Sequence, residues 1–273
     1  MTDLLNTGSQ PVMRVQGPAF GVIAECLRIQ STARARSRLA RLFGANPLLP
    51  DARSWYRSAL GEIAVAKSLK NLGPGWTVLQ AARMDSLNLN IDHVAIGPAG
   101  VFTITTKDHT GQRVWVGEDS LLVNGHRTNH IEDVRHAAHS VERLLRSSWD
   151  LPITVTPVIA LIDPGSLAFG KRRLRDVVVV RSAHLERTIT RRRSVLSEAS
   201  IAIYVGIADD RSSWHPDSRV KDDTLHYEHR FHHLQHQVSN AALRRHLWIV
   251  LGALVIGLPI LLAAVRAIFA WGA

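Results

Sequence analysis

The chain has 273 residues, one cysteine and a formal net charge of +10. This length accommodates one sizeable domain with accessory segments, and the single cysteine excludes an internal disulfide and a Cys-x-x-Cys zinc site. The positive charge is either plain solubility or a sign of polyanionic partners, which are nucleic acid or an anionic membrane surface. Charge alone does not choose between the two partners.

The N-terminal residues 1–50 are predicted to form a linker and a basic helix. The first 18 residues are largely polar, and helix is expected over Ala19–Phe43. Five arginines belong to this expected helix, namely Arg28, Arg34, Arg36, Arg38 and Arg41. Such a helix is either a solvated face or a surface that contacts an anionic membrane or nucleic acid.

Residues 51–208 are predicted to form an α/β domain. Helices are expected over Asp51–Leu72, His130–Ser148 and Ala183–Glu198. Strands are expected over Trp76–Gln80, Ile91–Gly97, Val101–Lys107, Arg113–Val116, Leu121–Val123, Thr154–Ile162, Val177–Val180 and Ile201–Ile207. This order predicts a mixed central sheet flanked by helices.

The C-terminal region is predicted to be a membrane anchor. Leu247–Val265 contains 19 residues without a charge, and a helix of that length is roughly 28 Å long, close to the hydrocarbon thickness of a bilayer. Arg244, Arg245 and His246 precede this transmembrane helix, whereas Arg266 alone follows it in the short tail 266–273. The positive-inside rule therefore places the N-terminal domain in the cytoplasm.

A histidine-rich linker is expected between the domain and the anchor, over residues 209–246. Four of its histidines, His226, His229, His233 and His236, are spaced to share one face of a helix. Such a stripe either binds a transition metal or senses pH, or it is the polar face of a juxtamembrane helix. The sequence favours the polar face, because no accompanying zinc signature is present.

The segment IDHVAIGPAGVFTITTKDHTG contains the residues that indicate chemistry. It predicts two strands joined at Gly97–Gly100, with Asp92 near the start of the first and Lys107 at the end of the second. Glu62 lies among apolar helix positions, where a glutamate needs a partner or a role. A carboxylate that holds a divalent ion, beside a lysine that stabilises phosphorane charge, suits phosphodiester cleavage. The alternative is that Asp92 and Lys107 are solvated residues at strand ends.

These residues resemble the NERD (nuclease-related) domain, a family similar to the PD-(D/E)xK nuclease superfamily. The resemblance covers about Trp55–Thr188 and is densest over Asn90–Gly111. It implies a restriction-endonuclease-like fold and nucleic acid as the ligand. It also implies a divalent ion, Mg²⁺ or Mn²⁺, held by Asp92 and Glu62, with Lys107 as the lysine of the family's ExK element.

One departure from the family pattern bears on catalysis. The glutamate of the ExK element falls on Thr105, and a neutral hydroxyl is a poor ligand for Mg²⁺. His109 lies two positions beyond Lys107 and is expected to compensate as a ligand or a base, which suits a softer ion such as Mn²⁺. The candidate catalytic residues are therefore Glu62, Asp92, Lys107 and His109.

Two basic runs are candidate nucleic-acid contacts or solvated ends of elements. They comprise Lys171, Arg172 and Arg173, and then Arg191, Arg192 and Arg193. Three hypotheses follow for the chain as a whole: a metal-dependent nuclease, an inactive module that binds nucleic acid or protein at a membrane, and a tethered protein whose charge serves anionic lipid. The sequence does not distinguish DNA from RNA and does not give the oligomeric state.

Overall fold

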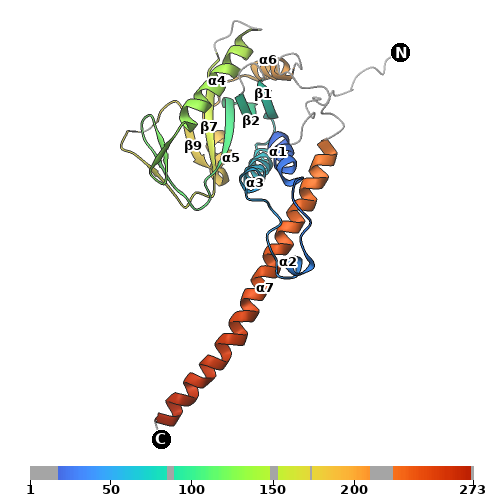
Figure 1. Ribbon diagram of the computed structural model, residues 1–273. Coiled ribbons are helices and arrows are strands. Elements are labelled where there is room, and N and C mark those ends of the chain that lie inside the picture. The colour runs from blue at the N-terminus through green and yellow to red at the C-terminus, as the bar shows by residue number, and fades with distance from the viewer. Residues whose placement is uncertain (1–17, 85–88, 148–152, 173, 210–223, 272–273) are drawn as a thin grey trace, which may run out of the picture.

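The computed structural model of the protein describes residues 18–84, 89–147, 153–172, 174–209 and 224–271. It describes their side chains except at 81–84, 89–90, 147, 209, 224 and 258–271. An α/β domain is followed by one long helix that extends away from it (Figure 1). The predicted α/β class, with a mixed sheet flanked by helices, is confirmed.

The described elements follow in chain order. The helices are α1 Phe20–Gln30, α2 Arg38–Leu42, α3 Ala52–Leu69, α4 His130–Ser147, α5 Leu185–Thr190, α6 Glu198–Asp209 and α7 Thr224–Trp271. The strands are β1 Thr77–Met84, β2 Leu89–Gly97, β3 Gly100–Asp108, β4 Arg113–Val116, β5 Leu121–Val123, β6 His126–Thr128, β7 Val155–Ile162, β8 Ser166–Phe169 and β9 Val178–Arg181.

The central sheet has the strand order β1-β2-β3-β7-β9. Strands β1, β2 and β3 form an antiparallel meander, whereas β3, β7 and β9 are parallel. Parallel neighbours need a crossover, and the chain between β3 and β7 supplies it with three short strands and α4. The sheet is therefore mixed, with β3 at the boundary between its two halves.

A second, four-stranded sheet has the order β6-β5-β4-β8 and lies beside the carboxyl ends of β3 and β7. Its apolar face packs on α4 and β7 through residues such as Val114, Leu121 and Ile159. Strands β6 and β8 were not predicted, because three or four residues carry too little periodicity to indicate a strand.

The helices cover the two faces of the central sheet as separate layers. Val65 and Leu69 of α3 pack with α5 against one face. Val141 of α4 and Tyr204 of α6 pack against the other. Alternate side chains of β3 enter these two layers, as expected for a strand buried on both faces.

Helix α7 begins against the domain and then leaves it (Figure 1). Phe231 and Leu234 are buried with α1 and α3, and the Phe231 ring lies 5.5 Å from the ring of Tyr56. In the described part of the chain, we find no helix whose length and hydropathy would suffice for a membrane span. The predicted span Leu247–Val265 lies inside α7, and its side chains from residue 258 onward lie outside those described.

Two elements predicted near the end of the domain are wrong. Ile201–Ile207 is helical in α6 and not a strand, because the Ser197 hydroxyl accepts from the Ser200 amide and caps a helix. The helix expected over Ala183–Glu198 ends at Thr190. Beyond it, the amides of Val195 and Leu196 donate to the carbonyl of Pro98 instead of continuing the helix.

The single helix expected over Ala19–Phe43 is also wrong, since it divides into α1 and α2. The hydroxyls of Ser31 and Thr32 donate back to main-chain carbonyls at the end of α1. The hydroxyl of Ser37 then accepts from the amide of Ala40 and begins α2. The intervening residues allow the chain to turn toward α7.

Gly61 sets the distance between α3 and the sheet. A β-carbon at this position would lie 3.0 Å from Ile162 Cγ1 and 3.4 Å from Thr106 Cγ2. We expect Gly61→Val to lower the free energy of unfolding by roughly 1–3 kcal/mol, because the larger side chain pushes α3 from the strands. Gly206→Ala in α6, where an added β-carbon would contact no other part of the protein within 4 Å, should instead stabilise by up to about 1 kcal/mol. Urea denaturation of both variants tests this, and equal effects would contradict it.

Candidate functional site

The β2–β3 hairpin positions Asp92 and Lys107. Its ladder runs from Gly97–Gly100 at the turn to His93–Ile104. Beyond that pair, the main-chain amide of Thr106 donates to Asp92 Oδ2. Strand β3 meanwhile stays paired with β7 as far as Asp108. At this point the hydrogen bond from the Thr106 amide to the Asp92 carboxylate replaces a main-chain hydrogen bond between the strands. This bond fixes Asp92 beside the end of β3.

Glu62 reaches the same place from α3. Its side chain is buried, with 9% exposed, and the close approach of the helix at Gly61 brings it toward β3. Burial raises the pKa of Glu62 first and the neighbouring Asp92 carboxylate second, so that the pKa is about 9 despite the opposing effect of Lys107. A free Glu62 is thus protonated at neutral pH, in a position where a cation would favour its charged form.

Asp92 titrates together with Glu62. Burial raises the pKa of Asp92 to about 6, against the opposing effects of the Thr106 amide and the Lys107 ammonium. Because Lys107 acts on both carboxyl groups, the structure brings together Glu62, Asp92 and Lys107 from α3, β2 and β3. Their chemical roles stay predictions, whereas their proximity is a feature of the fold.

His109 does not turn toward the carboxylates. Its Nδ1 lies 2.8 Å from Gln112 Oε1, and its Nε2 lies 3.2 Å from Nε2 of His130, the first residue of α4. The contacts are satisfied when His130 donates to His109 and His109 donates to Gln112. Both nitrogens of His109 are therefore engaged elsewhere, and the geometry gives no support to His109 as a replacement for the acidic residue at Thr105.

His130 and His93 are two neighbours of the site that sequence reasoning missed. Burial, and to a smaller extent the charges of Lys107 and His109, lower the pKa of His130 to about 4. Burial likewise lowers the pKa of His93 to about 4, opposed by the main-chain carbonyl of Glu62. Both imidazoles are neutral at pH 7. The only signal in the sequence was a histidine at the start of an expected helix and another beside Asp92.

The rim of the site carries one further ion pair. Arg57 Nε of α3 lies 3.0 Å from Asp108 Oδ2 at the end of β3. The Thr110 amide and hydroxyl also donate to Asp108. Arg57 is mostly exposed whereas Asp108 is not, so this pair joins α3 to the strand end.

Two arginines of the basic runs, Arg172 and Arg192, have contacts away from this cluster. Arg192 stacks its guanidinium 5.8 Å from the ring of Phe102, at the opposite end of β3 from Lys107. Arg172 pairs with Glu118 at the far tip of the second sheet. Arg173 lies outside the described residues. The role of the basic runs as nucleic-acid contacts stays a prediction.

The side chains of the site include two carboxylates that could bind a divalent ion. Among the side chains described, no group of three histidine, cysteine, aspartate or glutamate residues is placed to hold a metal. Thr105, at the position of the expected third donor, is buried and neutral. Mg²⁺ is often held by only two carboxylates, with water and substrate phosphate completing its shell. Glu62 and Asp92 suit an ion of that kind, one that binds together with a phosphate.

The histidine stripe of α7 does not form such a site either. His226, His229, His233 and His236 are all exposed, and His233 Nε2 lies 2.9 Å from the Gln237 side-chain nitrogen. No metal-binding group was found among the described residues of the helix. This arrangement favours the interpretation of a solvated polar face.

Residues 57–162 match the family model of the nuclease-related domain, NERD. The matched segment begins in α3 and ends with β7, so it includes Glu62, Asp92 and Lys107. The predicted resemblance is confirmed over that range. No curated protein and no solved structure matches the chain.

Burial of Glu62 predicts a pH-dependent stability. An acid whose pKa is raised in the fold costs stability progressively as pH rises from its unfolded value of 4.5 toward about 9. In EDTA, we expect Glu62→Gln to be more stable than wild type at pH 8.5 and nearly equal at pH 4.5. The gap should grow by at most about 1.4 kcal/mol per pH unit.

Denaturant unfolding at four pH values measures this gap. Glu132→Gln, which alters an exposed glutamate of α4, is the matched control and should show no such trend. A stability gap for Glu62→Gln that does not change with pH would contradict the burial argument.

Proposed function

We propose that the domain binds a nucleic-acid backbone at the Glu62–Asp92–Lys107 cluster and hydrolyses a phosphodiester bond with a divalent ion. One observation supports this most directly. Three elements separated in sequence bring two carboxyl groups and a lysine into mutual electrostatic contact, inside the segment that matches the nuclease-related domain. Polyanion binding also agrees with the net charge of +10.

Each residue of the cluster has a distinct proposed role. Glu62 and Asp92 would hold Mg²⁺ or Mn²⁺, and the bound ion would supply Lewis acidity toward the phosphate. The Thr106 amide keeps Asp92 oriented through its bond to Oδ2. Lys107 would stabilise the charge that develops on the phosphate oxygens and help to orient the attacking water. Arg57 at the rim would meet the neighbouring phosphate.

A second candidate is an inactive nuclease fold that binds nucleic acid without cleaving it. The buried neutral Thr105 favours it, because one anionic ligand fewer weakens the hold on the ion. In that case Lys107 and Arg57 contact the phosphate backbone, and salt-sensitive binding is the whole activity.

Attachment to a membrane through α7 is a further part of the proposal. Its support is a run of exposed apolar side chains from Leu247 to Ile256, directly after Arg244 and Arg245. With these arginines on the cytoplasmic side, the domain would work in the cytoplasm.

The first test follows cleavage by the full chain in detergent micelles. Labelled single- and double-stranded DNA and RNA are incubated with Mg²⁺, Mn²⁺ or EDTA. We expect ion-dependent cleavage that falls about a hundredfold or more in Lys107→Ala, because the charge developing in the transition state loses its partner. Lys70→Ala, which removes an exposed lysine just after α3, should cleave like wild type.

The possible results separate the two candidates. Cleavage that persists in EDTA or in Lys107→Ala would overturn the proposed site. Binding that weakens with salt and with Lys107→Ala, but without cleavage, would establish the second candidate.

Thr105 permits a gain-of-function test. We expect Thr105→Glu to restore a third carboxylate and raise Mn²⁺ affinity about tenfold or more, since affinity follows the charge of the ligand set. Thr105→Gln has the same size without the charge and is the matched control. Mn²⁺ titration by calorimetry reads the affinity, and equal affinities for the two variants would contradict a metal site at this position.

A further inference from the structure

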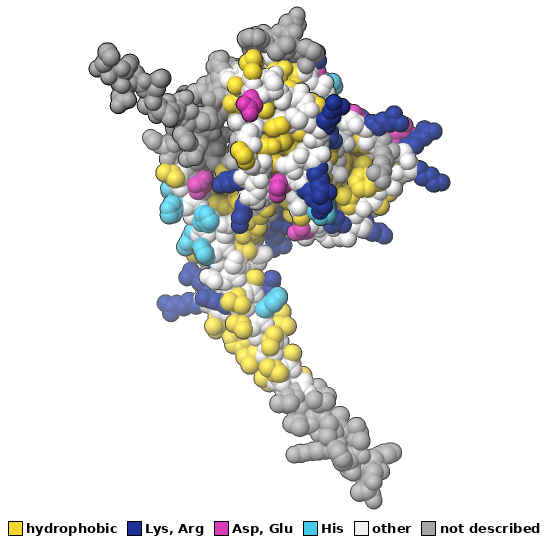
Figure 2. Space-filling model, turned by 180° about the vertical axis from the view of Figure 1, so that it is seen from behind, with side chains coloured by type: hydrophobic (Ala, Val, Ile, Leu, Met, Phe, Trp, Pro, Cys, Tyr) yellow, Lys and Arg dark blue, Asp and Glu magenta, His cyan; other side chains and the backbone are white. Residues whose placement is uncertain are grey.

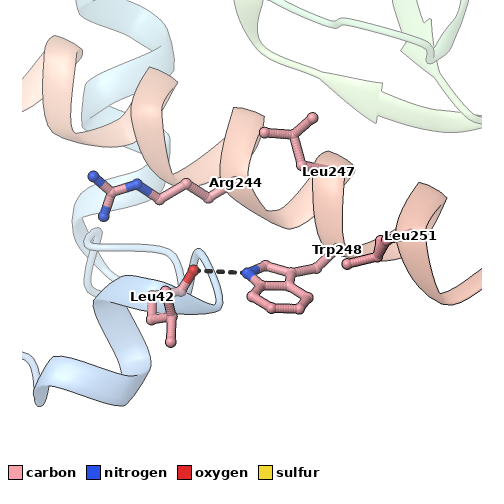
Figure 3. A pocket seen from close by; sticks show the side chains of 5 residues that line it. All are labelled: Leu42, Arg244, Leu247, Trp248 and Leu251. Carbon is pink, nitrogen blue, oxygen red and sulfur yellow. Dashed lines mark hydrogen bonds between the residues drawn. The ribbon is translucent and has the colours of Figure 1, made fainter.

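Helix α2 is fixed against α7 where that helix leaves the domain. Arg244 Nη1 donates to the Arg41 carbonyl at 3.0 Å. Trp248 Nε1 donates to the Leu42 carbonyl at 2.9 Å (Figure 3). The rings of Phe43 and Trp248 lie 5.0 Å apart. Leu42, Arg244, Leu247, Trp248 and Leu251 line an open pocket of about 290 Å³ at this contact. The two hydrogen bonds fix the position of α2 along the axis of α7.

Gly44 makes the contact close. Its φ of +71° is a conformation that favours glycine. A β-carbon there would overlap the Ala241 carbonyl oxygen and the Arg245 amide nitrogen. The chain directly after α2 therefore lies on the backbone of α7.

Five arginines lie on α2, on the residues just before it and on the adjoining turn of α7, and we call them the arginine cluster. The arginine cluster consists of Arg36, Arg38, Arg41, Arg244 and Arg245. Within the described residues, none of the five forms an ion pair with a carboxylate, whereas Arg28, Arg57 and Arg135 each do.

The bonds that the arginine cluster does make leave its charge uncompensated. Arg36, Arg41 and Arg244 donate to main-chain carbonyls of Ala45, Arg36 and Arg41 respectively. The pKa of Arg36 is lowered by burial and by the neighbouring charges of Arg41 and Arg244. Like charges crowded together without an acid favour an external anion.

Exposed apolar side chains continue directly from the arginine cluster. On α2 these are Leu39, Leu42 and Phe43, each at least half exposed. On α7, Leu247, Ile249, Val250, Leu254, Val255 and Ile256 are each more than half exposed. Figure 2 shows the same order along α7, in which basic and histidine side chains give way to a hydrophobic stretch.

We propose that the arginine cluster binds the headgroups of anionic phospholipids while the adjoining apolar side chains of α2 and α7 enter the lipid. Guanidinium groups match phosphate oxygens in pairs of hydrogen bonds. Trp248 lies at the boundary, where interfacial tryptophans are enriched. A nucleic acid would satisfy the charges but would leave the apolar side chains in water, so the combination favours a lipid surface. The inference rests on the proposed membrane attachment and adds lipid selectivity to it.

Vesicle flotation of the full chain tests the proposal. Vesicles of phosphatidylcholine alone are compared with vesicles containing about one third phosphatidylglycerol. We expect the anionic vesicles to bind wild type about tenfold or more tightly, because each basic side chain near an anionic surface contributes severalfold. The combined Arg36→Gln, Arg41→Gln and Arg244→Gln variant should lose most of that preference.

Two further variants separate charge from structure. Arg36→Lys, Arg41→Lys and Arg244→Lys together keep the charge and should keep the preference, even where the carbonyl bonds are lost. Lys67→Gln, Lys70→Gln and Arg187→Gln together remove equal charge from exposed positions on the domain and should bind like wild type.

Several outcomes would overturn the proposal. Equal binding to neutral and anionic vesicles would leave α7 as an attachment without headgroup recognition. No vesicle binding at all would refute membrane attachment as well. A glutamine variant that loses nucleic-acid binding but keeps its lipid preference would assign the arginine cluster to nucleic acid. None of these results bears on cleavage at Lys107, which the nuclease assay measures separately.

Discussion

The pairing of β3 on both sides is the constraint on which the rest of the domain depends. Antiparallel pairing with β2 fixes the hairpin, and parallel pairing with β7 fixes the far end of the strand. Because β3 is buried from both faces, neither pairing can slip without exposing one layer of the core. The position of Lys107 is therefore fixed. It lies beyond the last main-chain pair of β2 and β3, next to the hydrogen bond from the Thr106 amide to the Asp92 carboxylate.

The electrostatics of the site follow from that geometry. Two carboxyl groups at the end of a buried strand are costly to ionise together, and one lysine offsets only part of the cost. The free site thus holds a proton that a divalent cation would displace.

The sequence predicted the parts of this site that depend on local pattern. The hairpin, Glu62 on its helix, and the approach of Asp92 to Lys107 follow from periodicity, a tight turn and the family resemblance. His130 could not be predicted, because its partner His109 lies 21 residues earlier and only the packing of α4 brings them together. The prediction of a strand at Ile201–Ile207 is wrong because the segment is helical. The serine cap and the burial of Tyr204 and Ala208 outweigh the strand preference of its β-branched residues.

The continuity of α7 has a mechanical consequence. Phe231 is fixed against α3, and Trp248 is fixed against α2, on one unbroken helix. Seventeen residues of helix separate them by about 25 Å. A surface bound at the level of Trp248 would therefore hold the domain at a set height and in a set orientation. The domain could not pivot freely about that surface.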